Sequence, residues 1–438
     1  MTRSEAEAQR GVAAEGSLAL MAIFGQGLIY LLAIVLARGL GVEGFDDYAV
    51  AAAVFMLTAS IAPLGSEKYA LRVLPVFIER EDWGRVQGYM RFGMRRSVCM
   101  SLMLTMAVLG IMLVLGDALQ DSTRLAIAIT ALAVPLGALV HFGLEVLTAL
   151  GRQFIASVIF RIVVPATALA FAMLLLALYP EPSGAFAAAC WGPAWLLALL
   201  LMASVARHSL QPIAWRSQPV DEARHWRIES RPFFLYRLAT GLLAQSGLIA
   251  LALLNAPAVA IGAYAAAVGT AGLASVLASA TNRAYGRRLS LLMERQDYPG
   301  VMQLRRERMR WLLPSVALFL GIVMLFGREL LSLFRPEFAD QGAMALRILA
   351  VGISLAVLLA LAPTYLKYRR RKRTTYFIIA SAALTQIVAL GLLVPRFGAM
   401  GAASAFTLSM CGMYGAFAFM AHRELQASRA IWAAADNC

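Results

Sequence analysis

The sequence predicts an all-α integral membrane protein with about twelve transmembrane helices, arranged as two parallel repeats of six. The first observation is composition, because 61% of the 438 residues are hydrophobic and only 15% are charged. A soluble domain is about a quarter charged and below half apolar. The second observation is a series of long apolar stretches, and the third is the way Lys and Arg alternate between the two sides of these stretches.

Twelve apolar stretches are long enough to cross a bilayer, since a spanning helix needs roughly 20 apolar residues. Their continuous apolarity favours helices over the short alternating strands of a membrane barrel. The predicted spans are 17–37, 47–71, 92–116, 124–149, 154–178, 184–206, 233–254, 258–282, 309–334, 342–365, 374–394 and 398–421.

The basic residues predict the orientation of these spans. With the N-terminus inside, 33 of the 39 Lys and Arg residues fall on the inner side and six on the outer side. Loops on the cytoplasmic side carry such an excess of Lys and Arg. The sequence therefore predicts an even number of spans with both termini cytoplasmic. The same rule accounts for the net charge of +14, so nucleic acid is not expected as a partner.

Neither a cofactor nor an enzymatic reaction is expected. The four cysteines, Cys99, Cys190, Cys411 and Cys438, have no paired spacing, so we expect no disulfide and no metal site. The polar N-terminus shows no cleavable signal peptide. Gly39, Gly41 and Gly44 spell G-x-G-x-x-G, but they follow a predicted span and not a strand, so they indicate an outer turn. The sequence contains no hydrolase elbow, HExxH, CxxC pair or phosphate-binding loop.

The two halves of the chain resemble one another at a distance of about half its length. Gly262-Ala263-Tyr264 corresponds to Asp46-Asp47-Tyr48, and LLMERQDY from Leu291 corresponds to VFIEREDW from Val76. Repeats with an even number of spans share one topology and are related by an axis along the membrane normal. This pattern predicts an N-terminal six-helix lobe at 1–206 and a C-terminal six-helix lobe at 233–438.

The segment 207–232 is predicted to be a cytoplasmic linker between the lobes. It carries Trp215 and Trp226 among five arginines. Trp is typical of the headgroup level of a bilayer, and Arg is attracted to anionic lipid. We therefore expect an interfacial amphipathic segment, with a docking site for another protein as the alternative.

Ionisable residues inside predicted spans are expensive and usually face the protein interior. His141 and Glu145 lie four residues apart in the fourth span and so share a helix face. Arg161 lies in the fifth span, at a depth where it could pair with Glu145 across the hairpin. Together with Glu67 in the second span, these are the candidate ion-coupling residues; a structural ion pair inside one lobe is the alternative.

The stretch from Leu36 to Asp82 resembles a known family. It reads LARGLGVEGFDDYAV, then an apolar helix, then RVLPVFIERED. It is similar to the start of the polysaccharide biosynthesis (oligosaccharide flippase) proteins of the multidrug/oligosaccharidyl-lipid/polysaccharide exporter superfamily. The twelve-span layout and the Pro-x-Phe-Gly turn from Pro395 to Gly398 also fit. Family members typically carry Gly where Asp46 or Asp47 stands, which is a small departure.

The resemblance implies the exporter-superfamily fold and alternating access between two lobes. The implied activity is a flippase of the bacterial inner membrane that moves a polyprenyl-diphosphate-linked oligosaccharide from the cytoplasmic to the periplasmic leaflet. Membrane lipids are implied partners, as are a polysaccharide polymerase and glycosyltransferases. An ion-coupled multidrug exporter on the same fold is the alternative. A glycan polymerase or ligase would need a large outer loop, which this chain lacks.

The resemblance also indicates which helices line the cavity, namely the first, second, seventh and eighth. Arg and Lys are the natural clamps for a diphosphate. The predicted headgroup site therefore consists of Lys68, Arg72, Arg237 and Arg283; snorkelling of these side chains to the inner interface is the alternative. Gln26 and Gln245 are predicted to bind sugar hydroxyls, with interhelical hydrogen bonding as the alternative.

Overall fold

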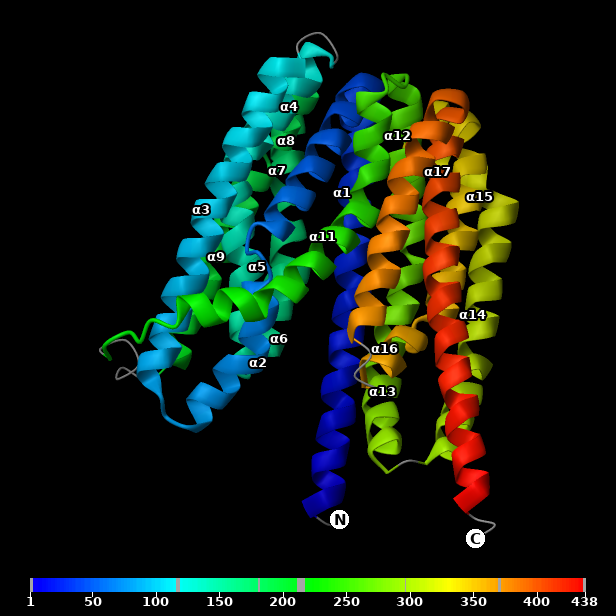
Figure 1. Ribbon diagram of the computed structural model, residues 1–438. Helices are drawn as coiled ribbons and strands as arrows, with labels where there is room; N and C mark the ends of the chain where they lie inside the picture. Colours follow the sequence, from blue (N-terminus) through cyan, green and yellow to red (C-terminus); the bar gives the residue numbers. More distant parts are fainter. Residues whose placement is uncertain are drawn as a thin grey trace. The chain divides into compact units, whose positions relative to one another are not determined.

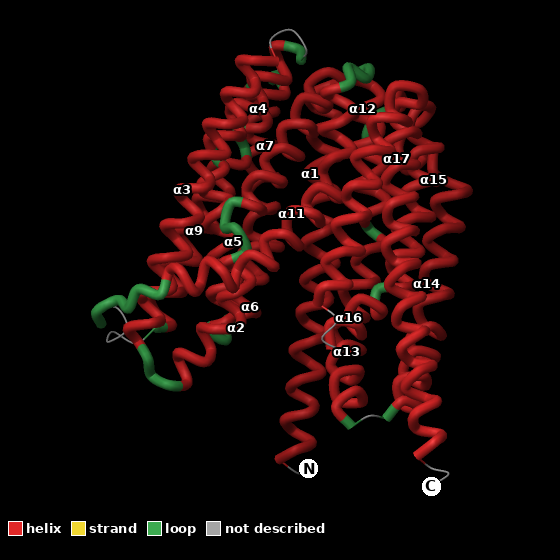
Figure 2. Tube along the Cα trace, viewed as in Figure 1, coloured by secondary structure: helices red, strands yellow, loops and turns green. Residues whose placement is uncertain are grey.

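Every regular element in the described part of the chain is a helix (Figure 1). The computed structural model describes residues 3–115, 119–179, 182–210, 217–295, 297–368 and 372–435. Figure 2 shows that most connections between these helices are short, with a longer loop leading into α11. The helices are α1 (Arg3–Ile61), α2 (Ser66–Glu79), α3 (Trp83–Leu115), α4 (Asp121–Leu132), α5 (Val134–Ala149), α6 (Gln153–Val158), η2 (Ile159–Val163), α7 (Val164–Leu178), α8 (Gly184–Ala188), α9 (Trp191–Ser209), α11 (Ala223–Leu253), α12 (Ala258–Gly272), α13 (Ala274–Glu294), α14 (Tyr298–Ser332), α15 (Pro336–Leu359), α16 (Leu361–Tyr368) and α17 (Lys372–Ala435).

The described helices account for all twelve predicted crossings. Nine of them are long and apolar enough to cross a membrane, and the bent pair α4 and α5 makes a tenth. Two of the ten, Leu20–Glu79 with 60 residues and Arg373–Gln426 with 54, would be about 80–90 Å long if straight, more than twice the bilayer core of about 30 Å. Each leaves helical geometry at a glycine, Gly41 (φ 78°) or Gly398 (φ 52°). The chain reverses there (Figure 1), so each contributes two crossings.

Contacts between residues divide the chain into two compact units. The N-terminal unit is Phe24–Ala265, and the C-terminal unit is Ala266–Cys438 together with Met1–Ile23. These units are defined by contacts and not by the internal repeat. The lobes predicted at 1–206 and 233–438 therefore stay a prediction.

The second predicted span is broken in the structure. The span was predicted as one helix over 47–71, but α1 ends at Ile61 and α2 begins at Ser66. Leu64 (φ 54°) and Gly65 (φ 79°) between them are left-handed. Pro63 cannot continue a helix without losing a backbone hydrogen bond, and Gly65 adopts the left-handed conformation without steric cost. The break places Glu67 in the first turn of a new helix, with Lys68 directly after it.

The second half of the predicted linker is not an interfacial segment. Residues 223–232 are the beginning of α11, which runs on to Leu253. Trp226 was expected at the headgroup level, but it is only 1% exposed. Its ring packs against Tyr89 at 5.2 Å and Phe92 at 5.5 Å, both on α3. Aromatic pairs at such distances add stability beyond the area they bury, which explains why the indole is inside. Trp215 lies outside the described residues.

In the C-terminal unit, the buried side chain of Arg308 caps the C-terminal end of α15. Arg308 of α14 donates hydrogen bonds to the carbonyl oxygens of Val357 (3.0 Å) and Leu358 (2.9 Å). Both carbonyls lie in the last turn of α15, where intrahelical donors run out. The guanidinium thus joins α14 to the junction between α15 and α16.

Arg308→Met is expected to destabilise the C-terminal unit by about 2–3 kcal/mol, because it removes two charge-assisted hydrogen bonds and leaves buried carbonyls without these donors. Arg306→Met on the same helix is the matched control, since Arg306 is exposed. Thermal unfolding of the purified variants in detergent measures the difference. Equal melting temperatures for the two variants would contradict this role for Arg308.

Candidate functional site

Five of the predicted residues meet in one polar cluster of the N-terminal unit. Glu67 and Lys68 come from the first turns of α2, His141 and Glu145 from one face of α5, and Arg237 from the middle of α11. The helix α2 packs against both α5 and α11. The cluster exists because the break at Pro63 and Gly65 starts α2 at this depth.

Two contacts join the three helices. Lys68 Nζ forms an ion pair with Glu145 Oε1. Arg237 Nη2 approaches His141 Nδ1 at 3.4 Å, and its Nε donates to the backbone carbonyl of Ser60 at 3.3 Å. A guanidinium can only donate, so Nδ1 of His141 is the acceptor and its proton sits on Nε2. That Nε2 is buried without a hydrogen-bond partner.

The sequence predicted Arg161 as the partner of Glu145 across the hairpin, whereas the ion pair that the structure gives Glu145 is made by Lys68. The two residues are 77 positions apart, and the packing of α2 on α5 brings them together. Arg161 lies exposed on η2.

Glu67 is the most deeply buried charged group of the cluster. It is 2% exposed, and neither carboxylate oxygen has a hydrogen-bond partner. The charges that act on it come from Arg237 and Lys68, which attract it, and from Glu145, which repels it. A buried carboxylate without donors is costly unless a cation or a proton compensates it. Chemically, the cluster can therefore take up a proton or a small cation.

The cluster presents its positive groups outward. The side chain of Lys68 is 37% exposed and that of its partner Glu145 only 12%. Arg237 is half-buried, whereas Glu67 and His141 are buried. An incoming ligand therefore meets the ammonium and guanidinium groups before it meets a carboxylate.

The other predicted residues lie elsewhere. Arg72 is exposed on α2, one turn beyond Lys68, and Gln26 and Gln245 are half-buried on α1 and α11. Arg283 belongs to α13 in the C-terminal unit, and its side chain lies outside the described residues.

Sequence reasoning missed the aromatic wall behind His141. The rings of Phe160 and Trp195 lie 5.4 Å and 5.7 Å from the imidazole. They close the inner side of the cluster with apolar surface. Neither ring carries a signal that separates it from an ordinary core residue, so no pattern in the sequence could have found them.

The long apolar helices define a class: a multi-pass membrane protein, here with a charged cluster among its helices. No family model and no curated protein matches the sequence. Solved structures, however, match over nearly the whole chain. One is an inward-facing multidrug resistance transporter of the MATE family, which belongs to the MOP superfamily (TM-score 0.68, 14% identity, 94% of this chain and 99% of the other).

A second similar structure is the lipid II flippase MurJ in an inward closed conformation (TM-score 0.66, 13% identity, 92% of this chain and 87% of the other). A third is a MOP-superfamily transporter from Pyrococcus furiosus, whose binding pocket is described as having reverse polarity (TM-score 0.60, 14% identity, 95% and 96%). The fold of this chain is therefore similar to that of these transporters, as the family resemblance of the sequence implied. At these identities the likeness establishes the fold and leaves the substrate open.

Proposed function

We propose that the protein is a flippase for a polyprenyl-diphosphate-linked oligosaccharide. It would move this lipid from the cytoplasmic to the periplasmic leaflet of a bacterial inner membrane, by alternating access and with both termini cytoplasmic. The proposed role is transport for surface polysaccharide biosynthesis, alongside a polysaccharide polymerase and glycosyltransferases. No chemical conversion of the substrate is part of the proposal.

The observation that carries the proposal is the polarity of the cluster. Its accessible charges, on Lys68 and Arg237, are positive, and its carboxylates are buried or paired. A diphosphate is an anion that ammonium and guanidinium groups bind by charge-assisted hydrogen bonds. A cationic drug would instead be served by accessible carboxylates.

Binding of the diphosphate would rearrange the ion pair in the cluster. The phosphate oxygens would compete with Glu145 for Lys68, because a cation has a limited number of donors to share. A carboxylate that loses its partner in a buried place needs a proton or another cation. Substrate binding would thereby promote uptake of a cation at Glu145, with Glu67 nearby as a second acceptor.

An ion-coupled multidrug exporter is the second candidate. Buried Glu67 favours it, since a deep carboxyl without a hydrogen-bond partner is suited to ion exchange. The similarity to multidrug transporters of the same fold supports it as well.

Deletion of the gene is expected to make lipid-linked oligosaccharide accumulate in the cytoplasmic leaflet and to remove one surface glycan, because the glycan can no longer cross. Lipid analysis together with a profile of surface glycans measures both effects, and the missing glycan identifies the substrate. Complementation with the wild-type chain should restore the glycan, and the exposed-site variant Arg80→Gln should do so equally well.

Unchanged surface glycans with a higher sensitivity to cationic dyes would contradict the flippase proposal. That pair of results would establish the multidrug exporter in its place. The two candidates thus predict opposite outcomes from one deletion strain.

A further inference from the structure

A basic cavity of the N-terminal unit lies apart from the polar cluster. We call it the arginine pocket. It has a volume of about 660 Å³ and is formed by α3, the segment 219–221 and the start of α11. Four arginines line it: Arg91, Arg95, Arg96 and Arg227.

The charge of the arginine pocket is largely uncompensated. Asp221 is the one carboxylate in its lining. Arg91, Arg95 and Arg227 form no ion pair with a described residue. Arg96 is held in place by a hydrogen bond to Ser230 Oγ at 2.5 Å and lies over the ring of Phe92 at 5.6 Å. The pocket therefore concentrates positive charge in a concave surface, a favourable arrangement for phosphate groups.

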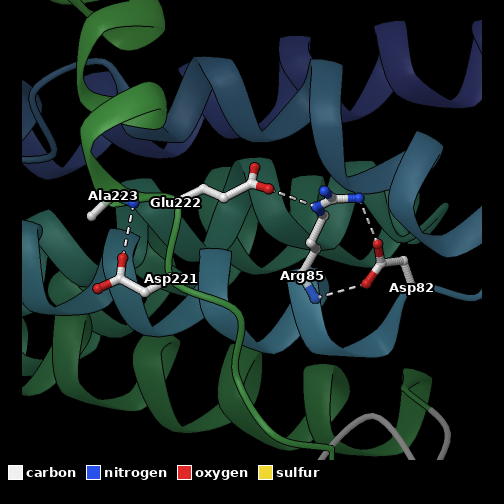
Figure 3. Close-up of polar contacts among 5 residues, drawn as sticks. All are labelled: Asp82, Arg85, Asp221, Glu222 and Ala223. Atoms are coloured by element: carbon white, nitrogen blue, oxygen red, sulfur yellow. Dashed lines mark hydrogen bonds and ion pairs between the residues drawn. The ribbon is translucent and has the colours of Figure 1, made fainter.

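One wall of the pocket is fixed by a separate set of polar contacts (Figure 3). Arg85 Nε donates to Glu222 Oε1 and Arg85 Nη1 to Asp82 Oδ2, both at 2.9 Å. Asp221 Oδ1 accepts a hydrogen bond from the backbone of Ala223, also at 2.9 Å. The backbone N–H of Val220 donates to the carbonyl of Gly84 at 3.0 Å. Arg85 is thus paired with two carboxylates and stabilises this wall of the pocket. Arg91, Arg95 and Arg227 of the lining form no ion pair with a described residue.

The opposite end of the pocket is apolar. Cys99, Met100 and Met103 complete its lining. Met103 lies seven residues beyond Arg96 on α3, which is about 10 Å along the helix axis. Met103 is 66% exposed and Leu102 51%, so this part of α3 presents an apolar surface outward. The pocket therefore has a charged end and an apolar end along the axis of α3, a helix long and apolar enough to cross a membrane.

We propose that the arginine pocket binds a membrane lipid with a phosphate-bearing headgroup. The phosphate would sit among the arginines, and the acyl or prenyl chain would run past Met100 and Met103. The four arginines could instead be cytoplasmic loop charges without a ligand, but such charges need neither a braced cavity nor a continuous apolar end. The proposal does not depend on the transported substrate.

Native mass spectrometry of the full-length protein in detergent tests the proposal. The probes are phosphatidylglycerol, phosphatidylcholine with the same acyl chains, a polyprenyl diphosphate and inorganic pyrophosphate. We expect an anionic lipid to bind more tightly than phosphatidylcholine. Arg95→Gln/Arg227→Gln, which replaces two exposed arginines of the pocket, should weaken this binding roughly 10- to 30-fold. Arg80→Gln/Arg224→Gln removes the same charge from exposed sites outside the lining and should not.

Preference for phosphatidylglycerol would identify a bulk anionic lipid, and preference for the polyprenyl diphosphate would identify the transported class; both support the proposal. It is overturned if the two double variants bind lipid equally, or if pyrophosphate binds as tightly as the lipids. Because the readout is binding and not transport, a failure here leaves the deletion experiment unaffected, and the reverse also holds.

Discussion

Gly65→Ala is expected to destabilise the N-terminal unit by about 3 kcal/mol or more. Gly65 has a φ of 79°, which costs an L-residue about 1–2 kcal/mol. An added Cβ would also lie 2.5 Å from the carbonyl oxygen of Ser230 and closer still to the amide nitrogen of Phe234. These are backbone atoms of α11, so they cannot move aside as a flexible side chain would. The helices α2 and α11 would have to separate.

Gly151→Ala is the matched control for this prediction. Gly151 also has a positive φ, 76°, but an added Cβ meets nothing within 4 Å. Gly151→Ala should therefore lose only the stability that a positive φ costs an alanine, about 1–2 kcal/mol. Thermal unfolding of the three proteins in the same detergent measures the difference. If both variants lose the same stability, the close approach of α2 and α11 contributes nothing.

The sequence predicted the crossings well and their interruptions poorly. Hydropathy identified the two long helices around Gly41 and Gly398 as pairs of spans, because a turn between crossings needs polar or Gly- and Pro-rich residues. It missed the break at residues 62–65 because apolar residues continue through it. A proline inside a helix can kink it, but Pro63 alone does not specify the left-handed turn at Gly65 or its close approach to the backbone of α11.

The sequence singled out the residues of the polar cluster but not the contacts between them. Charged groups inside apolar spans are visible in a sequence, so Lys68, Glu145 and Arg237 could be found. Their partners depend on which helices pack together, and that is a long-range property: Lys68 and Glu145 are 77 residues apart. The nearest hairpin partner, Arg161, was the natural prediction from spacing alone. Trp226 illustrates the same limit, since its burial depends on α3.

Lys68→Met is expected to reduce transport by tenfold or more, if the proposed function holds. The variant removes one of the two cations of the cluster, and a charge-assisted hydrogen bond contributes about 1.5–3 kcal/mol. It also leaves Glu145 buried without its partner, which should lower stability by about 1–2 kcal/mol, a value reduced because Lys68 is partly exposed. Flipping of a fluorescent polyprenyl diphosphate in proteoliposomes measures the first effect, and thermal unfolding measures the second.

The double variant Lys68→Met/Glu145→Gln separates the two effects, since it removes the carboxylate charge that Lys68→Met leaves unpaired. Its stability should recover toward that of the wild type, while its transport stays low, because the diphosphate still lacks its cation. Arg80→Met, which removes an exposed cation beside the C-terminal end of α2, should transport normally. Recovery of transport in the double variant would instead mean that Lys68 serves only to neutralise Glu145. The diphosphate would then have to be bound by other cations, with Arg237 as the next residue to replace.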